Sequence, residues 1–136
     1  MPYLNTQTLA VGSKTFILSE FTALDRIRDL QYVAKSPTME KPGAEATDQE
    51  RMAYGVFMEE LTLDQVAHSI ALSLSHANEN LEDQSVEALH EMVKDKWPNR
   101  SVNIAYDMIK ELNMPEKSNP TTPSDNDDQE ELTPEK

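Results

Sequence analysis

Histidines are the residues of this chain whose chemistry suits metal binding or proton transfer, and there are three of them. His76 and Glu79 stand three residues apart in a predicted helix, so they would share one helix face. His68 lies eight residues before His76, near that face but not on it. A metal site needs three or four ligands, and two ligands at helical spacing often arise by chance. We therefore expect no metal here and interpret these histidines as solvated polar positions.

The motifs of common enzyme classes are missing from the sequence. It contains no nucleophile elbow, Walker loop, glycine-rich dinucleotide turn or HExxH helix. Its three glycines, Gly12, Gly43 and Gly55, are too few for a phosphate-binding loop. The chain has no cysteine, which excludes disulfides, thiolate metal ligands and a thiol nucleophile. We predict that the protein is not an enzyme and binds no cofactor.

The charge of the chain is strongly negative. Its 136 residues include 12 Lys and Arg against 25 Asp and Glu, a formal net charge of −13. Such a chain does not bind nucleic acid through phosphates, because the electrostatic term has the wrong sign. Residues 59–95 alone carry nine acidic side chains and one lysine. This region is either a solvated helix face or an acidic surface that meets a basic partner or mimics nucleic-acid phosphate.

The composition predicts one folded domain followed by a tail. From Met114 onward the chain has seven acidic and two basic residues, four of its eight prolines, and one large aliphatic residue, Leu132. Such a segment buries too little apolar surface to offset its conformational entropy. We predict a helical domain over residues 1–113 and a disordered, acidic, proline-rich tail over 114–136. No apolar run reaches the length of a membrane span and no signal peptide is recognisable, so we expect a soluble cytoplasmic protein without membrane contact.

The first elements are expected to be a β-hairpin and a helix. Over residues 3–18, apolar residues alternate with polar ones, and Gly12-Ser13 marks the turn. Two strands alone are marginally stable, so the hairpin must pack on helices or on another subunit. Ser19 is a good N-cap for a helix that ends before Pro37. The apolar residues of this helix recur at helical spacing on one face: Phe21, Leu24, Ile27, Leu30 (or Gln31) and Ala34.

Capping signals divide the rest of the chain into further helices. Thr47 with Glu50, and Thr62 with Gln65, both fit capping boxes, so we expect two helices with a bend near residue 61. Another helix is expected from about residue 83 or 85 to Pro98, and the last from about 99–101 to Met114. The predicted fold is mainly α, a small bundle of four to five helices with an N-terminal β-hairpin.

Candidate partner-binding residues come from the region with the least regular helical pattern. Met39, Met52 and Met58 gather with Phe57 between residues 37 and 61. Methionine adapts to varied apolar partners, although it also fills gaps in ordinary cores. We select four residues for partner contact: Tyr54, Phe57, Met58 and Leu61.

Two segments resemble one protein family. Residues 16–30, FILSEFTALDRIRDL, resemble the LSELSAL-x-RI-x-x-L stretch of the lambda-type minor tail protein G family, the tail assembly chaperones of long-tailed phages. Trp97-Pro98 and the helix after it, with Ala105, Ile109 and Leu112, are similar to the C-terminal helix of that family. The resemblance covers roughly residues 14–112, and the acidic tail also suits the family.

The resemblance implies a chaperone rather than an enzyme. Proteins of this family bind the tape measure protein in the cytoplasm of the infected cell and are absent from the finished virion. A ribosomal frameshift usually makes a longer form whose extra domain recruits the tail tube protein. The lambda slip site encodes a Gly-Lys pair, whereas this chain has no glycine after Gly55. We also expect a homo-oligomer, because many copies would be needed along an elongated client. The alternative is an acidic DNA mimic that inhibits a host nucleic-acid-binding protein.

Overall fold

The computed structural model describes residues 3–114, and the predicted tail beyond Met114 lies outside these described residues. A β-hairpin comes first, followed by four α-helices and one short 3-10 helix. The elements are β1 (Thr6–Val11), β2 (Lys14–Ser19), α1 (Ala23–Ala34), α2 (Asp48–Leu74), η1 (Glu79–Leu81), α3 (Val86–Lys96) and α4 (Asn99–Leu112). The expected mainly α fold with an N-terminal hairpin is confirmed.

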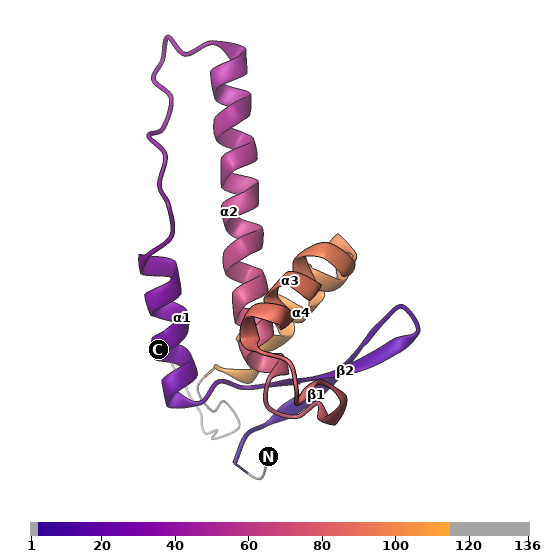
Figure 1. The fold of residues 1–136 in the computed structure, drawn as a ribbon. Helices are drawn as coiled ribbons and strands as arrows, with labels where there is room; N and C mark the ends of the chain where they lie inside the picture. Colours follow the sequence, from indigo (N-terminus) through magenta and orange to yellow (C-terminus); the bar gives the residue numbers. More distant parts are fainter. Residues whose placement is uncertain (1–2, 115–136) are drawn as a thin grey trace, which may run out of the picture.

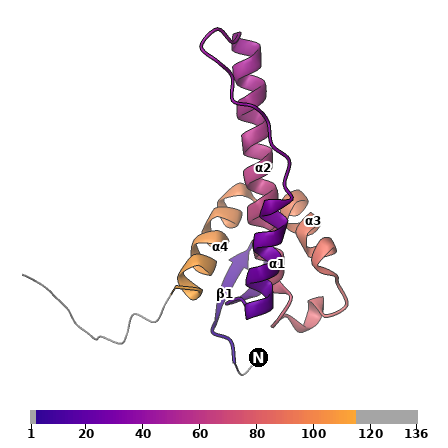
Figure 2. The same cartoon turned by 90° about the vertical axis from the view of Figure 1, so that its left-hand side faces the viewer.

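Helix α2 is the long axis of the molecule. Its C-terminal half is surrounded by the hairpin, α3 and α4, while α1 runs alongside (Figures 1 and 2). Its N-terminal half projects beyond these elements, accompanied only by the extended segment that connects α1 to α2 (Figure 1). Burial follows the same division, because every fully buried residue of α2 lies between Ala67 and Leu74.

The hairpin forms as the sequence predicts. Leu9 pairs with Phe16 across the two antiparallel strands, and Gln7 pairs with Leu18. Gly12 adopts a positive φ of 61° in the turn, a conformation that side chains with a Cβ disfavour. Leu9, Phe16 and Leu18 are buried, so one face of the hairpin packs on the core.

Polar side chains from α2 and the turn after it cover the outer edge of β2. The side chain of Asn78 accepts a hydrogen bond from the Ile17 amide and donates one to the Ile17 carbonyl, both at 2.8 Å. Ser73 Oγ accepts from the Ser19 amide at 2.8 Å and donates to the Ser19 carbonyl at 2.7 Å. These side chains occupy the position of a third strand, so backbone groups that would be unpaired at a sheet edge are satisfied.

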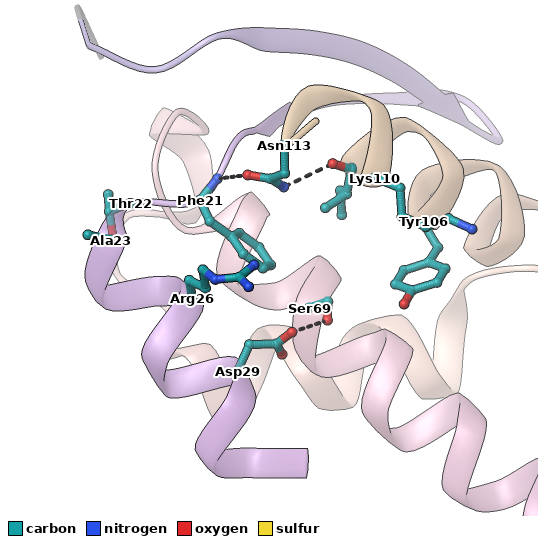
Figure 3. Close-up of a pocket in the computed structure, with 10 residues that line it drawn as sticks. Phe21, Thr22, Ala23, Arg26, Asp29, Ser69, Tyr106, Lys110 and Asn113 are labelled. Carbon is teal, nitrogen blue, oxygen red and sulfur yellow. Dashed lines mark hydrogen bonds between the residues drawn. The ribbon is translucent and has the colours of Figure 1, made fainter. Parts of the chain in front are cut away.

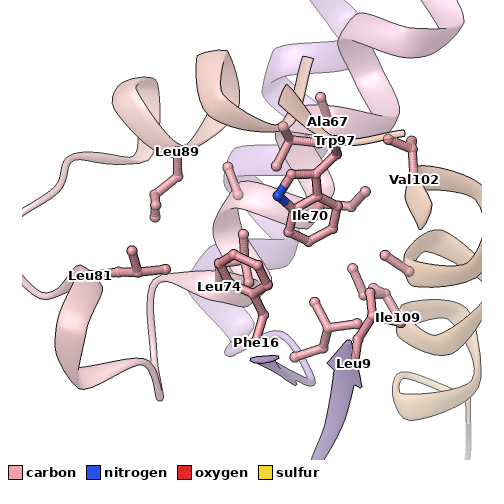
Figure 4. Packing of buried hydrophobic residues seen from close by; sticks show 14 residues of the cluster. Leu9, Phe16, Ala67, Ile70, Leu74, Leu81, Leu89, Trp97, Val102 and Ile109 are labelled. Carbon is pink, nitrogen blue, oxygen red and sulfur yellow. The ribbon is translucent and has the colours of Figure 1, made fainter. Parts of the chain in front are cut away.

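The hydrophobic core lies where the hairpin, α2, α3 and α4 meet (Figure 4). Trp97 is buried at the corner between α3 and α4, with its ring centroid 5.0 Å from that of Phe16. The cluster has fourteen members: Leu9, Phe16, Leu18, Ala67, Ile70, Ala71, Leu74, Leu81, Leu89, Val93, Trp97, Val102, Ala105 and Ile109. Helix α1 contributes no residue to this cluster.

Two predicted helix boundaries are wrong. Ser19 ends β2, and α1 is capped instead by Thr22, whose hydroxyl accepts from the Asp25 amide at 3.0 Å. The bend expected near residue 61 is absent, because α2 runs without interruption from Asp48 to Leu74. Thr62 and Gln65 fit a capping box in sequence, but residues 56–65 contain no glycine or proline that would end the preceding helix. The other predicted cap, Thr47 with Glu50, is confirmed.

Within residues 3–114, no helix has the length and apolar character that crossing a membrane requires.

Candidate partner-binding surface

Helix α1 is attached to α2 through polar side chains. Asp25 accepts hydrogen bonds from the Thr22 amide and from His76. One turn later, the two carboxylate oxygens of Asp29 bond to His68 Nδ1 and to Ser69 Oγ, both at 2.8 Å. Tyr32 ends the row by donating its hydroxyl proton to Asp64 at 2.5 Å. The face of α1 that meets α2 is therefore lined by two carboxylates and a phenol.

Asp64 is the centre of a small network that joins α1, α2 and α3. It accepts from Tyr32 and, at 3.2 Å, from Lys94 Nζ, and His90 Nε2 lies 2.9 Å from its carbonyl oxygen. Burial opposes ionisation of Asp64, but the hydrogen bonds from Tyr32 and Lys94 outweigh it and lower the pKa of this carboxyl. Burial and the bond to Asp64 raise the pKa of Tyr32 to about 12. The ionised Asp64 therefore holds a neutral phenol.

The three histidines belong to the polar contacts that join α1, α2 and α3, which we call the polar layer. His68 stacks on the ring of Tyr32, with ring centroids 3.9 Å apart, and each histidine lies within 4.0 Å of an aspartate oxygen. The interpretation of the histidines as solvated positions is therefore wrong, because each is paired with an aspartate. The sequence alone does not predict these pairs, since the partners of His68 and His76 lie on another helix, α1. In residues 3–114, no three His, Asp or Glu side chains are grouped in a way that could hold a metal ion.

The apolar stripe of α1 faces solvent. Leu24 and Ile27 are each 51% exposed, Leu30 is 57% exposed and Val33 is 44% exposed. The sequence correctly places Leu24, Ile27 and Leu30 on one face, but an amphipathic helix normally turns that face to the core. Here the opposite, polar face is turned inward. In Figure 2, α1 lies in front of α2, and no other helix or strand among residues 3–114 covers its outer side.

The four candidate residues lie on the projecting half of α2. Tyr54, Phe57 and Leu61 are partly buried beside the segment that connects α1 to α2, and Met58 is 38% exposed. Phe57 and Leu61 line a cavity of about 390 Å³ together with Pro37. The structure thus brings Phe57 and Leu61 together at one cavity, with Met58 beside them on the helix.

A second surface of the projecting half escaped selection from the sequence. Met52 is 72% exposed and Val56 is 51% exposed, on either side of Gly55. A shallow groove follows this line of the helix at spacings of three and four residues. Its lining consists of Asp48, Arg51, Met52, Gly55, Val56, Glu59 and Glu60. The helical spacing of Met52, Val56 and the acidic residues is the signal in the sequence that could have predicted this groove.

A cleft of about 390 Å³ separates α1 from α4 (Figure 3). Arg26 enters it from α1, Lys110 and Tyr106 from α4, and Asp29 and Ser69 form its floor. The Asp29 carboxylate is already bonded to Ser69 and His68, and Lys110 Nζ lies 3.4 Å from Asp107 and 4.9 Å from the Tyr106 ring centroid. At the end of the cleft, Asn113 accepts from the Phe21 amide at 2.8 Å and so ties α4 to the start of α1. Asp29 and Asn113 therefore hold elements together, whereas the contacts of Lys110 lie within α4.

Comparison with curated proteins and with solved structures gives no significant match. A protein-family model described as "Bacteriophage lambda tail assembly chaperone, TAC, protein G" matches residues 2–131. This match covers nearly the whole chain, including both segments that carry the resemblance in the sequence. The structure is consistent with this match: it is a small, mainly helical fold in which α1 turns an apolar face to solvent. The chain belongs to the bacteriophage lambda tail assembly chaperone family, the family of protein G.

Proposed function

We propose that this protein binds the tape measure protein in the host cytoplasm and keeps it soluble until the tail tube assembles around it. The protein itself is then absent from the finished virion. Membership of the tail assembly chaperone family makes tail proteins the expected partners. The elongated tape measure protein is the one among them whose apolar stretches need shielding before assembly.

The observation that carries this proposal is the gathering of apolar side chains on the projecting half of α2. Met52, Val56 and Met58 are exposed there, and Phe57 and Leu61 line a cavity on the same half of the helix. Exposed apolar surface on a small acidic protein is typical of a site that receives another chain. Methionine and aliphatic side chains suit an apolar helical client, because they adapt to varied shapes.

Co-expression tests this function directly. The tape measure protein of the same phage is expressed with and without this chain, and the fraction that remains in the soluble lysate is measured. We expect most of the client to precipitate alone and to stay soluble in the presence of the chaperone. An unchanged soluble fraction, together with salt-sensitive binding to a basic nuclease, would favour the acidic DNA mimic instead.

A paired variant tests the candidate residues. Phe57→Asp with Met58→Asp places two charges where an apolar client would bind, so the client should precipitate as it does alone. Ile104→Asp is the matched control, because Ile104 is 44% exposed on α4, away from both surfaces, and its substitution should keep the client soluble. Circular dichroism must show cooperative melting of each variant. Loss of the fold in the paired variant would identify Phe57 and Met58 as structural residues.

Two further properties belong to this proposal. The chain self-associates, because many copies are needed along a long client. A frameshifted longer form carries an added domain that recruits the tail tube protein, and the nucleotide sequence around codons 113–136 would reveal the slip site. Mass spectrometry of infected cells would detect the longer product by its novel C-terminal peptides.

A further inference from the structure

Helix α1 presents a basic apolar face on an otherwise acidic protein. Its two acidic residues, Asp25 and Asp29, are turned toward α2 and paired there. Arg28 and Lys35 are exposed beside the apolar stripe, and Arg26, also exposed, lines the cleft next to α4. The outward charge of α1 is therefore positive, although the chain carries a net charge of −13.

The groove on the projecting half of α2 has the complementary character. Met52 and Val56 supply its apolar walls, and Asp48, Glu59 and Glu60 form an acidic rim. Arg51 does not neutralise this rim fully, because its guanidinium is turned to backbone carbonyls of the connecting segment, with 2.9 Å between Nη2 and Ala44 O.

Gly55 lies in the middle of this groove. Among residues 3–114, a Cβ added to Gly55 would meet no atom within 4 Å, so no described neighbour in the same copy requires a glycine at this position. Glycine in an exposed helix interior costs roughly 1 kcal/mol relative to alanine. A side chain from another helix can approach the backbone more closely at a glycine than at any other residue, so the groove can accept a packed helix.

We propose that α1 of one copy docks in the Gly55 groove of a second copy. The apolar stripe of α1 then covers Met52 and Val56, while Arg28 and Lys35 face the acidic rim of Asp48, Glu59 and Glu60. The two surfaces differ, so each copy offers one of each and the contact is heterologous. This assignment rests on the proposed function and deepens its self-association by naming two surfaces, and it leaves the cavity lined by Phe57 and Leu61 open for the client.

A second copy fits α1 better than the chain's own C-terminal segment does. Residues 115–136 are acidic, so their charge is opposite to that of the outward face of α1, but their only large aliphatic residue is Leu132. One leucine cannot cover four exposed aliphatic side chains. The groove, in contrast, offers apolar and acidic groups together. A contact of one helix on one helix lies at the small end of protein interfaces, so we expect association that depends strongly on concentration.

Sedimentation velocity of the full-length chain, without client, tests this contact. We expect the weight-average sedimentation coefficient to rise with concentration. Gly55→Leu fills the groove, and Ile27→Glu places a charge in the apolar stripe, so each should weaken self-association on the order of tenfold or more. Both positions are exposed and leucine is a good helix former, so circular dichroism should show an intact fold.

Mixing the two variants provides the decisive measurement. The Gly55→Leu variant keeps a normal α1, and the Ile27→Glu variant keeps a normal groove, so an equimolar mixture should form a dimer that does not grow further. Gly43→Leu and Ile104→Glu are matched controls, at a glycine that also has open space and at an exposed isoleucine of α4, and should associate as the unmodified chain does.

Three results would overturn the proposal. The first is an unmodified chain that stays monomeric at every concentration. The second is self-association that survives Gly55→Leu or Ile27→Glu, which would point to another surface such as the edge of β1. The third is an equimolar mixture of the two variants that does not form the dimer. That result would also be expected if the acidic C-terminal segment, rather than a second copy, occupied α1. Solubilisation of the tape measure protein is measured separately, so failure here leaves the proposed function standing.

Discussion

Tyr32 is the residue through which α1 is joined most directly to the rest of the bundle. Its hydroxyl donates to the Asp64 carboxylate, which also accepts from Lys94 on α3. Tyr32→Phe removes this donor and leaves the ring on His68 in place. We expect the free energy of unfolding to fall by about 1.5–3 kcal/mol, the range for a hydrogen bond to a charged acceptor.

Chemical denaturation followed by circular dichroism measures this loss. Tyr106→Phe is the matched control, because the Tyr106 hydroxyl is outside the Asp64 network. An equal effect of the two substitutions would mean that the Asp64 bond contributes nothing specific.

The same network gives stability a dependence on pH at both ends. The pKa of Asp64 is lowered in the folded chain, so its contribution is present above the ordinary pKa of 3.8 and is lost as the pH falls below it. The pKa of Tyr32 is raised from 10.0 to about 12, so its contribution is present below pH 10 and is lost as the pH rises toward 12. The raised pKa of Lys94 acts in the same alkaline direction.

Unfolding measured across the alkaline range separates these contributions. We expect the unmodified chain to lose stability between about pH 10 and 12, and Tyr32→Phe to lose less over the same interval. A variant that loses as much as the unmodified chain would show that Tyr32 does not cause the alkaline loss.

At the scale of elements, the covering of the β2 edge by Asn78 is the contact with the clearest consequence. Asn78→Ala leaves both the Ile17 amide and the Ile17 carbonyl without partners at a part-buried position, and we expect a loss of about 2–3 kcal/mol. Hydrogen exchange of the Ile17 amide, measured by NMR, should accelerate in the same variant. Asn80→Ala, at an exposed position of η1, should change neither quantity.

Most of the elements could be predicted from local signals in the sequence. The turn at Gly12, the cap at Thr47 and the end of α3 before Pro98 each depend on residues close together in the chain. The bend predicted at residue 61 failed because a capping box is read from residue types alone, and a helix already in progress continues through them.

The direction of α1 could not be predicted from its own residues. Periodicity shows that Leu24, Ile27 and Leu30 share a face, but it does not say what that face meets. The answer depends on His68, Ser69 and His76, which lie about forty to fifty residues later and supply partners for the acidic face. The Gly55 groove could not be predicted for a related reason, because open space around a residue is known only when its neighbours have been placed.

At the scale of the whole molecule, the core of the described residues draws on the hairpin, α2, η1, α3 and α4. The fourteen core residues lie between Leu9 and Ile109, and Asn113 adds the last tie from α4 to α1. Residues 115–136 contribute seven acidic and two basic side chains and only Leu132 as a large aliphatic residue. Removal of residues 115–136 should therefore leave the melting temperature almost unchanged, because no group named in the core or in the polar layer is lost.

Removal of that segment should still change how copies associate. It lowers the net negative charge of each copy, so repulsion between copies falls and self-association should strengthen, most visibly at low salt. Thermal melting and sedimentation of the shortened chain, each at low and high salt, measure the two effects. A melting temperature that drops by several degrees would show instead that the segment packs on the bundle. In that case the exposed basic face of α1 would be the place to look for its contact, since Arg28 and Lys35 are exposed positive charges that could attract this acidic segment.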